Sequence, residues 1–173
     1  MYRFRTLLKV FAIGVMLIFP ISRSFAGGEP YYYYVKYQQD INKALQELRQ
    51  REFHAGRYFP AMFDIQFPVD ENSPAPGAKH DSIDMALEAA EADGTRSILD
   101  IERISESKEL MAAASLSEDV LKTTFGTAQP THETVETNLD PIFEMIDRGQ
   151  AVYVVVYKDG SPDEIMFAGY SFD

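Results

Sequence analysis

The chain has 173 residues, of which 46% are hydrophobic and none is cysteine, so disulfides, thiol nucleophiles and thiolate zinc sites are excluded. It carries 16 basic and 27 acidic residues, which gives a formal net charge of −11. Such a chain repels the phosphate backbone of nucleic acids, so we expect no nucleic-acid binding, and it attracts basic protein partners. An acidic surface can also serve solubility alone, and this alternative stays open.

The first 26 residues are typical of a secretory signal peptide. Three basic residues lie within the first nine positions, an apolar run covers 10–21, and Ala26 is a small residue before a cleavage site. The apolar run is shorter than the ~20 residues that span a bilayer. An uncleaved anchor helix beginning at Leu7 is the alternative. We predict cleavage, a periplasmic or secreted location, and no membrane contact after cleavage.

Removing the predicted signal peptide makes the remaining chain more acidic. Four of the 16 basic residues and none of the 27 acidic residues lie in positions 1–26, so residues 27–173 carry 12 bases against 27 acids, a net charge of −15. A chain of about 150 residues buries roughly 68–70% of its unfolded surface, which is enough for one hydrophobic core. We therefore expect a single acidic domain over residues 27–173.

The stretch 31–37, YYYYVKY, has five tyrosines in seven positions and predicts a strand, because tyrosine and valine favour pleated, half-buried positions. Side chains alternate between the two faces of a strand, so Tyr32 and Tyr34 share one face. An ordinary strand with an aromatic core face explains the run. The alternative is an exposed aromatic patch in which Tyr32 and Tyr34, with Tyr153 or Tyr170, bind a partner.

Apolar spacing and turn residues predict the elements of the middle of the chain. We expect a helix over 39–54 that begins after Asp40 and ends at Gly56, a short strand over 63–67, a loop over 68–80, a helix over 80–94 and a strand over 95–104. The long loop is either a connector or a functional lid. Residues 105–115 have little strand character and are expected to be irregular.

The last third of the chain predicts two helices and a hairpin. The helices are expected between Ser115 and Gly126 and between Pro130 and Gly149. The β-rich runs 151–157 and 164–170 are separated by KDGSPD, which predicts a β-hairpin with a loop longer than two residues. The fold class expected is α+β, with a largely antiparallel sheet, the C-terminal hairpin and about four helices packed mainly on one face.

Few residues form a pattern that indicates chemistry. In THETVE, His132 and Glu136 stand four residues apart on one face of an expected helix, where two such side chains could ligate a metal. Acidic residues in a first helical turn also serve the helix dipole, so the pair is a weak metal candidate. The chain has no P-loop, no G-x-G-x-x-G and no G-x-S-x-G. We expect no cofactor and assign no catalytic residue.

These observations favour an exported, non-catalytic protein-binding module, of inhibitor or immunity type or an envelope accessory protein, over an enzyme. Charge would steer a basic partner and tyrosines would anchor it. The alternative is a secreted hydrolase that uses paired carboxylates, for example on carbohydrate. A structural or regulatory role in the envelope is a third hypothesis. The sequence indicates neither the partner nor the oligomeric state.

Overall fold

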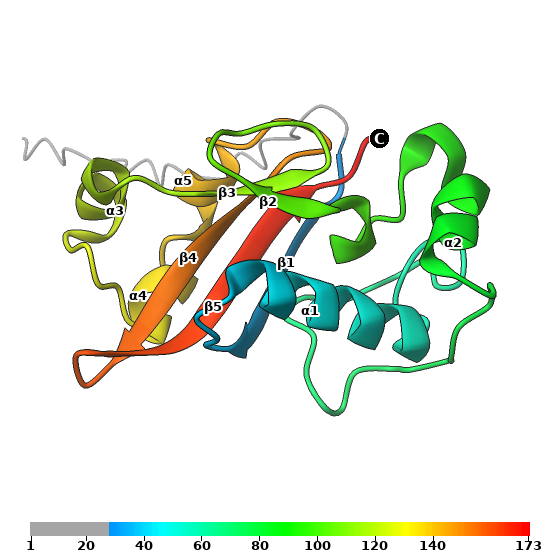
Figure 1. The fold of residues 1–173 in the computed structure, drawn as a ribbon, viewed down its shortest axis with the longest axis horizontal. Coiled ribbons are helices and arrows are strands. Elements are labelled where there is room, and N and C mark those ends of the chain that lie inside the picture. The colour runs from blue at the N-terminus through cyan, green and yellow to red at the C-terminus, as the bar shows by residue number, and fades with distance from the viewer. Residues whose placement is uncertain (1–27) are drawn as a thin grey trace, which may run out of the picture.

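A five-stranded mixed sheet forms the centre of the fold in the computed structural model, which describes residues 28–173. The predicted signal peptide, 1–26, lies outside the described residues. The strand order is β1-β5-β4-β3-β2, in which β1, β5 and β4 are antiparallel and β4, β3 and β2 are parallel (Figure 1). The strands are β1 (Pro30–Lys36), β2 (Arg103–Ser105), β3 (Ala112–Ser115), β4 (Ala151–Lys158) and β5 (Ser161–Tyr170).

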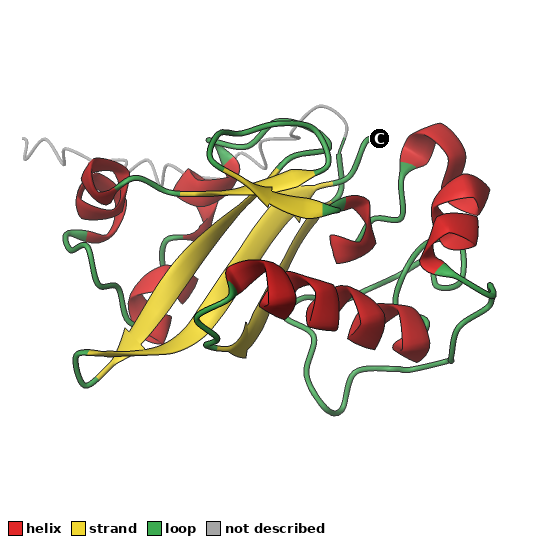
Figure 2. Cartoon of the chain, in the orientation of Figure 1, coloured by secondary structure: helices red, strands yellow, loops and turns green. Residues whose placement is uncertain are grey.

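Helices cover both faces of this sheet (Figure 2). The helices are α1 (Ile41–Ala55), α2 (Ile83–Ala90), α3 (Glu118–Phe125), α4 (His132–Glu136) and α5 (Leu139–Phe143), with 3₁₀ turns η1 (Glu91–Asp93) and η2 (Ile98–Asp100). The predicted α+β class and the C-terminal hairpin are confirmed. The distribution of helices differs from the expectation, because α1 packs on one face while α4 and α5 pack on the other. Within residues 28–173, no helix is long and apolar enough to cross a membrane.

Strand alternation produces a separate hydrophobic core on each face of the sheet. On the α1 face, Tyr31 and Tyr33 are fully buried together with Leu45 of α1. On the opposite face, three valines of β4 pack with Val135 of α4 and Ile142 of α5; they are Val152, Val154 and Val156. Because both faces of the central strands are apolar, each face needs its own cover, and this is why the helices divide between them.

Helix α1 follows the sequence prediction closely. The Asp40 side chain accepts a hydrogen bond from the Lys43 backbone N–H at 2.9 Å, which caps the first turn. Gly56 ends the helix in the left-handed conformation with φ +74°, where a glycine is favoured. Both boundary residues were predicted from the sequence.

The segment before the last third of the chain departs from the prediction. No strand forms over 63–67, where Pro60 and Pro68 bracket the run and remove backbone donors. Residues 95–104 contain η2 and only the start of the short β2, not one strand. The stretch expected to be irregular contains β3, whose three alanines have low strand propensity but are buried, with Ala113 and Ala114 paired to β4.

Two boundaries in the last third are also corrected. The helix predicted between Pro130 and Gly149 is split into α4 and α5, because Pro141 donates no backbone hydrogen bond and its ring would clash with the carbonyl of Thr137 in a continuous helix. The hairpin loop is shorter than predicted, since β4 reaches Lys158 and β5 begins at Ser161. Asp159 and Gly160, with φ +51° and +76°, form the two-residue turn.

We predict that Gly169→Ala destabilises the fold by about 1–3 kcal/mol, the usual cost of overpacking a core. Tyr31 pairs with Gly169 across β1 and β5, and an added Cβ would lie 2.7 Å from the Tyr31 hydroxyl oxygen and 2.8 Å from ring carbons. Denaturant unfolding measures the change. Ser161→Ala, at the exposed start of the same strand, is the control and should change the unfolding free energy by less than ~0.5 kcal/mol. Equal effects of the two variants would contradict the packing argument.

Candidate functional site

The four candidate tyrosines do not form one patch. Tyr32 and Tyr34 are half-buried on the α4–α5 face, where Tyr170 is buried behind them. Phe143 links this group, with its ring centroid 6.4 Å from Tyr32 and 5.4 Å from Tyr170. Tyr153 lies on the α1 face of the sheet and packs there with the core. A shared binding surface is therefore available to Tyr32 and Tyr34, whereas Tyr153 is separated from them by the sheet.

Tyr34 stands beside the residues that the sequence proposed as a metal pair. Its ring centroid is 4.2 Å from that of His132, with an interplanar angle of 33°. The Nδ1 atom of His132 is 2.8 Å from Oε2 of Glu164 on β5. Glu136 lies on the same helix as His132, and its carboxylate neighbours Tyr34. We call Tyr32, Tyr34, His132, Glu136 and Glu164 the tyrosine–histidine ledge.

Local contacts hold the ledge in place. The Thr131 side chain accepts a hydrogen bond from the Thr134 backbone N–H at 3.3 Å, so α4 begins at His132. The backbone N–H of Tyr157 in β4 donates to the Pro130 carbonyl at 2.8 Å and ties the start of this segment to the sheet. His132 is thereby held over β1 and β5, although it lies about a hundred positions from Tyr34 in the sequence.

The ledge has an unusual polar interior. Burial and the neighbouring Glu136 carboxylate raise the pKa of Tyr34, so its phenol stays protonated at neutral pH and can donate a hydrogen bond. Burial also raises the pKa of Tyr32, with Glu136 acting in the same direction. The Tyr34 hydroxyl and Oε1 of Glu136 are both buried and face each other; neither has another hydrogen-bond partner, and their interaction contributes to the raised pKa of Tyr34. The two polar atoms therefore belong to the interior of the ledge, and the part open to a ligand is the partly exposed aromatic surface of Tyr32 and Tyr34.

An open hollow of about 470 Å³ adjoins the ledge at His132 and Glu164. Its charged lining is mainly acidic, with four carboxylates against one lysine, Lys158. Lys36 lies at its edge, 3.7 Å from Asp163. The carboxylates belong to Glu133, Asp159, Asp163 and Glu164. The arrangement suits a cationic group, which the carboxylates attract and the exposed face of an aromatic ring can stabilise further.

The pair His132 and Glu136, the weak metal candidate of the sequence, has no third ligand beside it among the described residues. Within residues 28–173, no group of three or more histidine, cysteine, aspartate or glutamate side chains could hold a metal ion. His132 already engages Glu164 through Nδ1 and stacks on Tyr34. His132 and Glu136 therefore serve the ledge in the described structure, and their role as ligands stays a prediction from spacing.

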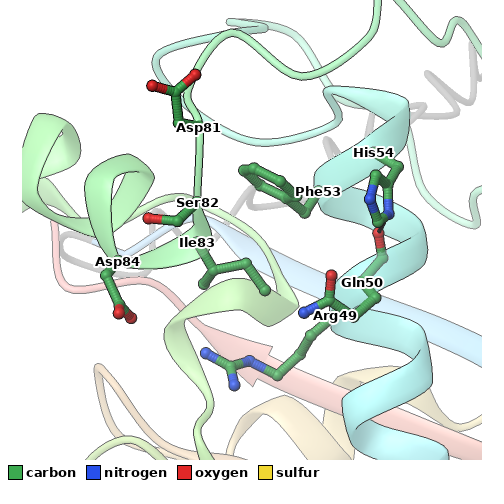
Figure 3. A pocket seen from close by; sticks show the side chains of 8 residues that line it. All are labelled: Arg49, Gln50, Phe53, His54, Asp81, Ser82, Ile83 and Asp84. Carbon is green, nitrogen blue, oxygen red and sulfur yellow. Dashed lines mark hydrogen bonds between the residues drawn. The ribbon is translucent and has the colours of Figure 1, made fainter.

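A second hollow, of about 400 Å³, lies between α1 and the start of α2 (Figure 3). We call it the α1–α2 pocket. The Phe53 side chain projects into it from α1, and the Arg49 guanidinium extends toward the side where Asp84 lies. It is lined by Arg49, Gln50, Phe53, His54, Asp81, Ser82, Ile83 and Asp84. The two walls of this pocket are about thirty residues apart in the sequence, so no local sequence pattern predicts it.

A buried acid, Asp100, lies in η2 with no exposed surface. Its Oδ1 atom accepts hydrogen bonds from the Thr95 backbone N–H at 2.7 Å and the Thr95 hydroxyl at 2.8 Å, whereas Oδ2 has no partner. Burial raises the pKa of Asp100 to about 6, nearby Asp173 acts in the same direction, and the bonds from Thr95 oppose the shift. Asp100 is therefore a structural acid held at an energetic cost above pH 6.

A scan against protein-family models and searches of curated proteins and of solved structures found no match to this chain.

We predict that Asp100 makes the fold more stable at pH 5 than at pH 7.5. A folded pKa of about 6 exceeds the unfolded value near 3.9, so the folded state binds the extra proton, and stability rises as the pH falls through 6. This group should contribute ~1 kcal/mol between the two pH values. Denaturant unfolding at both pH values measures it. In Asp100→Asn the gain should disappear; a gain equal to that of the parent protein would contradict the assignment.

Proposed function

We propose that the protein is an exported, non-catalytic binding module that recognises a basic segment of a partner protein at the tyrosine–histidine ledge. One observation carries the proposal: half-buried aromatic rings and carboxylates converge beside an open, acidic hollow. A lysine or arginine of the partner would enter the hollow, pair with its carboxylates and pack on the Tyr34–His132 stack. We also propose a periplasmic or secreted location, supported by the signal-peptide pattern of residues 1–26.

Charge and aromatic character have separate roles in this proposal. The net charge of −15 over residues 27–173 would steer a basic partner and raise the association rate at low salt. The rings of Tyr32 and Tyr34 would supply contact area at a low cost in side-chain entropy. Binding should therefore weaken as the salt concentration rises, while the anchoring contribution of the tyrosines persists.

The alternative is a secreted hydrolase that uses paired carboxylates. Asp100 and Asp173 are the pair that favours it, because one of them has a raised pKa and the other lies nearby. Asp100 has no exposed surface, however, so a substrate could not reach it without a rearrangement of η2. The open ledge is accessible without any such change, and binding is the function that the geometry supports better.

We predict that neutralising two carboxylates of the acidic hollow beside the ledge, Glu133 and Glu164, abolishes partner capture while leaving the fold intact. The protein is immobilised, exposed at low salt to envelope extract of the cell that produces it, and bound proteins are identified by mass spectrometry. A basic partner should be retained by the parent protein and lost by Glu133→Gln/Glu164→Gln. The control, Glu88→Gln/Glu106→Gln, removes the same charge at exposed positions outside the ledge and should retain the partner.

Two results would contradict the proposal. The first is that the parent protein retains no basic partner at low salt. The second is that both double variants lose the partner equally, which would mean that only overall charge matters. Thermal unfolding of each variant verifies that the fold is intact. Tyr34→Phe provides a finer test, because it keeps the ring contact with His132 and removes the buried hydroxyl that faces Glu136.

A further inference from the structure

We propose that the α1–α2 pocket binds a small zwitterion with an apolar side chain, an amino acid or a dipeptide, with its carboxylate on Arg49 and its ammonium on Asp84. The proposal is independent of the tyrosine–histidine ledge. In Figure 1, α2 lies at the right end of the molecule and α4 at the left end, so the two sites are well separated. Either site could be lost without affecting the other.

Arg49 has hydrogen-bonding capacity to spare. Its Nη1 atom donates to Oε1 of Gln46 at 2.9 Å, and its Nη2 atom donates to the Leu99 carbonyl at 3.2 Å. These bonds use two of the five N–H donors of a guanidinium and fix its position. The Nε atom is buried without a partner. Because Nε is enclosed by protein, the donors left for a ligand are the second hydrogens of Nη1 and Nη2, a planar pair that matches the geometry of a carboxylate.

Arg49 and Asp84 face each other across the pocket without forming an ion pair. They lie on opposite walls in Figure 3, and among the described residues no salt bridge within 4.0 Å joins them. Burial lowers the pKa of Arg49, and the nearby carboxylates of Glu102, Asp84 and Asp100 oppose this shift. Asp84 therefore interacts electrostatically with the Arg49 guanidinium without a direct contact. A ligand that carries both a carboxylate and an ammonium group would pair with Arg49 on one wall and with Asp84 on the other.

The charges of the pocket select a zwitterion over a simple ion. A plain anion would be attracted by Arg49 but repelled by Asp81 and Asp84 at the start of α2. A plain cation would be attracted by Asp81 and Asp84 but repelled by Arg49. An α-amino acid or a dipeptide satisfies both, since each carries one carboxylate and one ammonium, which share a single Cα in the amino acid and are separated by a peptide unit in the dipeptide.

The half-buried Ile83 supplies the apolar surface for the ligand's side chain, and Phe53, which is only 6% exposed, closes the floor of the pocket. Phe53 of α1 and Ile83 of α2 line opposite parts of the pocket, and both also belong to the core that α1 covers. The volume of about 400 Å³ lies in the usual range of small-molecule sites, ~300–1,000 Å³. The walls are held in position, because the Ser82 hydroxyl caps α2 at the Met85 backbone N–H, 3.2 Å away. A preformed site loses little entropy on binding.

The test is a titration of the isotope-labelled full chain, followed by NMR chemical shifts and by calorimetry. The probes are leucine, leucyl-leucine, N-acetyl-leucine and leucinamide. Leucine or leucyl-leucine should bind and shift the resonances of α1 and α2, and whichever binds more tightly identifies a free amino acid or a dipeptide as the source. The two blocked analogues, which each lack one charge, should bind at least about tenfold more weakly.

Variants assign the two contacts. Arg49→Gln and Asp84→Asn should each weaken binding by about tenfold or more. Arg103→Gln and Glu88→Gln, which change exposed charges outside the pocket, should bind as the parent does. Because Arg49 also bonds the Leu99 carbonyl, Asp84→Asn is the decisive variant if Arg49→Gln unfolds. The proposal is overturned if neither zwitterion binds at millimolar concentration, if a blocked analogue binds equally well, or if Asp84→Asn binds as the parent does.

Discussion

The hairpin of β4 and β5 is the constraint on which the rest of the structure depends. Its strands occupy the centre of the sheet and pair antiparallel from Ala151 with Gly169 to Lys158 with Ser161. Both faces of the hairpin are apolar, so neither can remain in water. One face requires α1, and the other requires the helices between β3 and β4. The positions of both candidate sites follow from this division, since the ledge belongs to one face and the α1–α2 pocket to the helix that covers the other.

The tyrosine run of β1 has two roles for the same reason. Tyr31 and Tyr33 point into the α1 core and are fully buried, whereas Tyr32 and Tyr34 point to the other face and remain half-buried near α4 and α5. β1 is one of the two edge strands, and α4 and α5 cover its side chains on this face only in part. The run is therefore both a core strand and part of an accessible aromatic surface, and the two explanations that the sequence left open each apply to half of the tyrosines.

Elements determined by local signals were predictable, and those determined by distant pairing were not. Helix α1 has its cap at Asp40, its stop at Gly56 and an apolar stripe between them, so the sequence alone located it. Strand β3 consists of alanines that become a strand only because β4 lies alongside. The ledge shows the same limit: Tyr34 and His132 were each identified as candidates, but nothing near either residue indicates that they stack or that Glu164 joins them. Contacts between residues so far apart arise from topology, which a single sequence encodes only weakly.

The segment between α1 and α2 contains the loop 68–80, for which the sequence left a connector and a lid as alternatives, and it is fastened near both of its ends. Glu52 of α1 is fully buried, and its carboxylate accepts two hydrogen bonds from the Arg57 guanidinium, at 2.6 and 3.1 Å. This ion pair holds the chain against α1 immediately after Gly56. At the other end, the Gly77 backbone N–H donates to the Ala55 carbonyl at 2.9 Å, and the Lys79 backbone N–H donates to the Tyr58 hydroxyl at 3.0 Å.

These anchors return the chain to the C-terminal end of α1 just before α2 begins, so Asp84 and Ile83 face α1 at a fixed position. A buried ion pair adds little net stability, because removing both charges from water is costly, but leaving one partner alone is strongly unfavourable. The Glu52–Arg57 ion pair therefore acts mainly on geometry, because it fixes the direction in which the chain leaves α1. The position of the α1–α2 pocket therefore depends on how α1 ends. The backbone contacts on either side of the segment between α1 and α2 keep Arg49 and Asp84 apart.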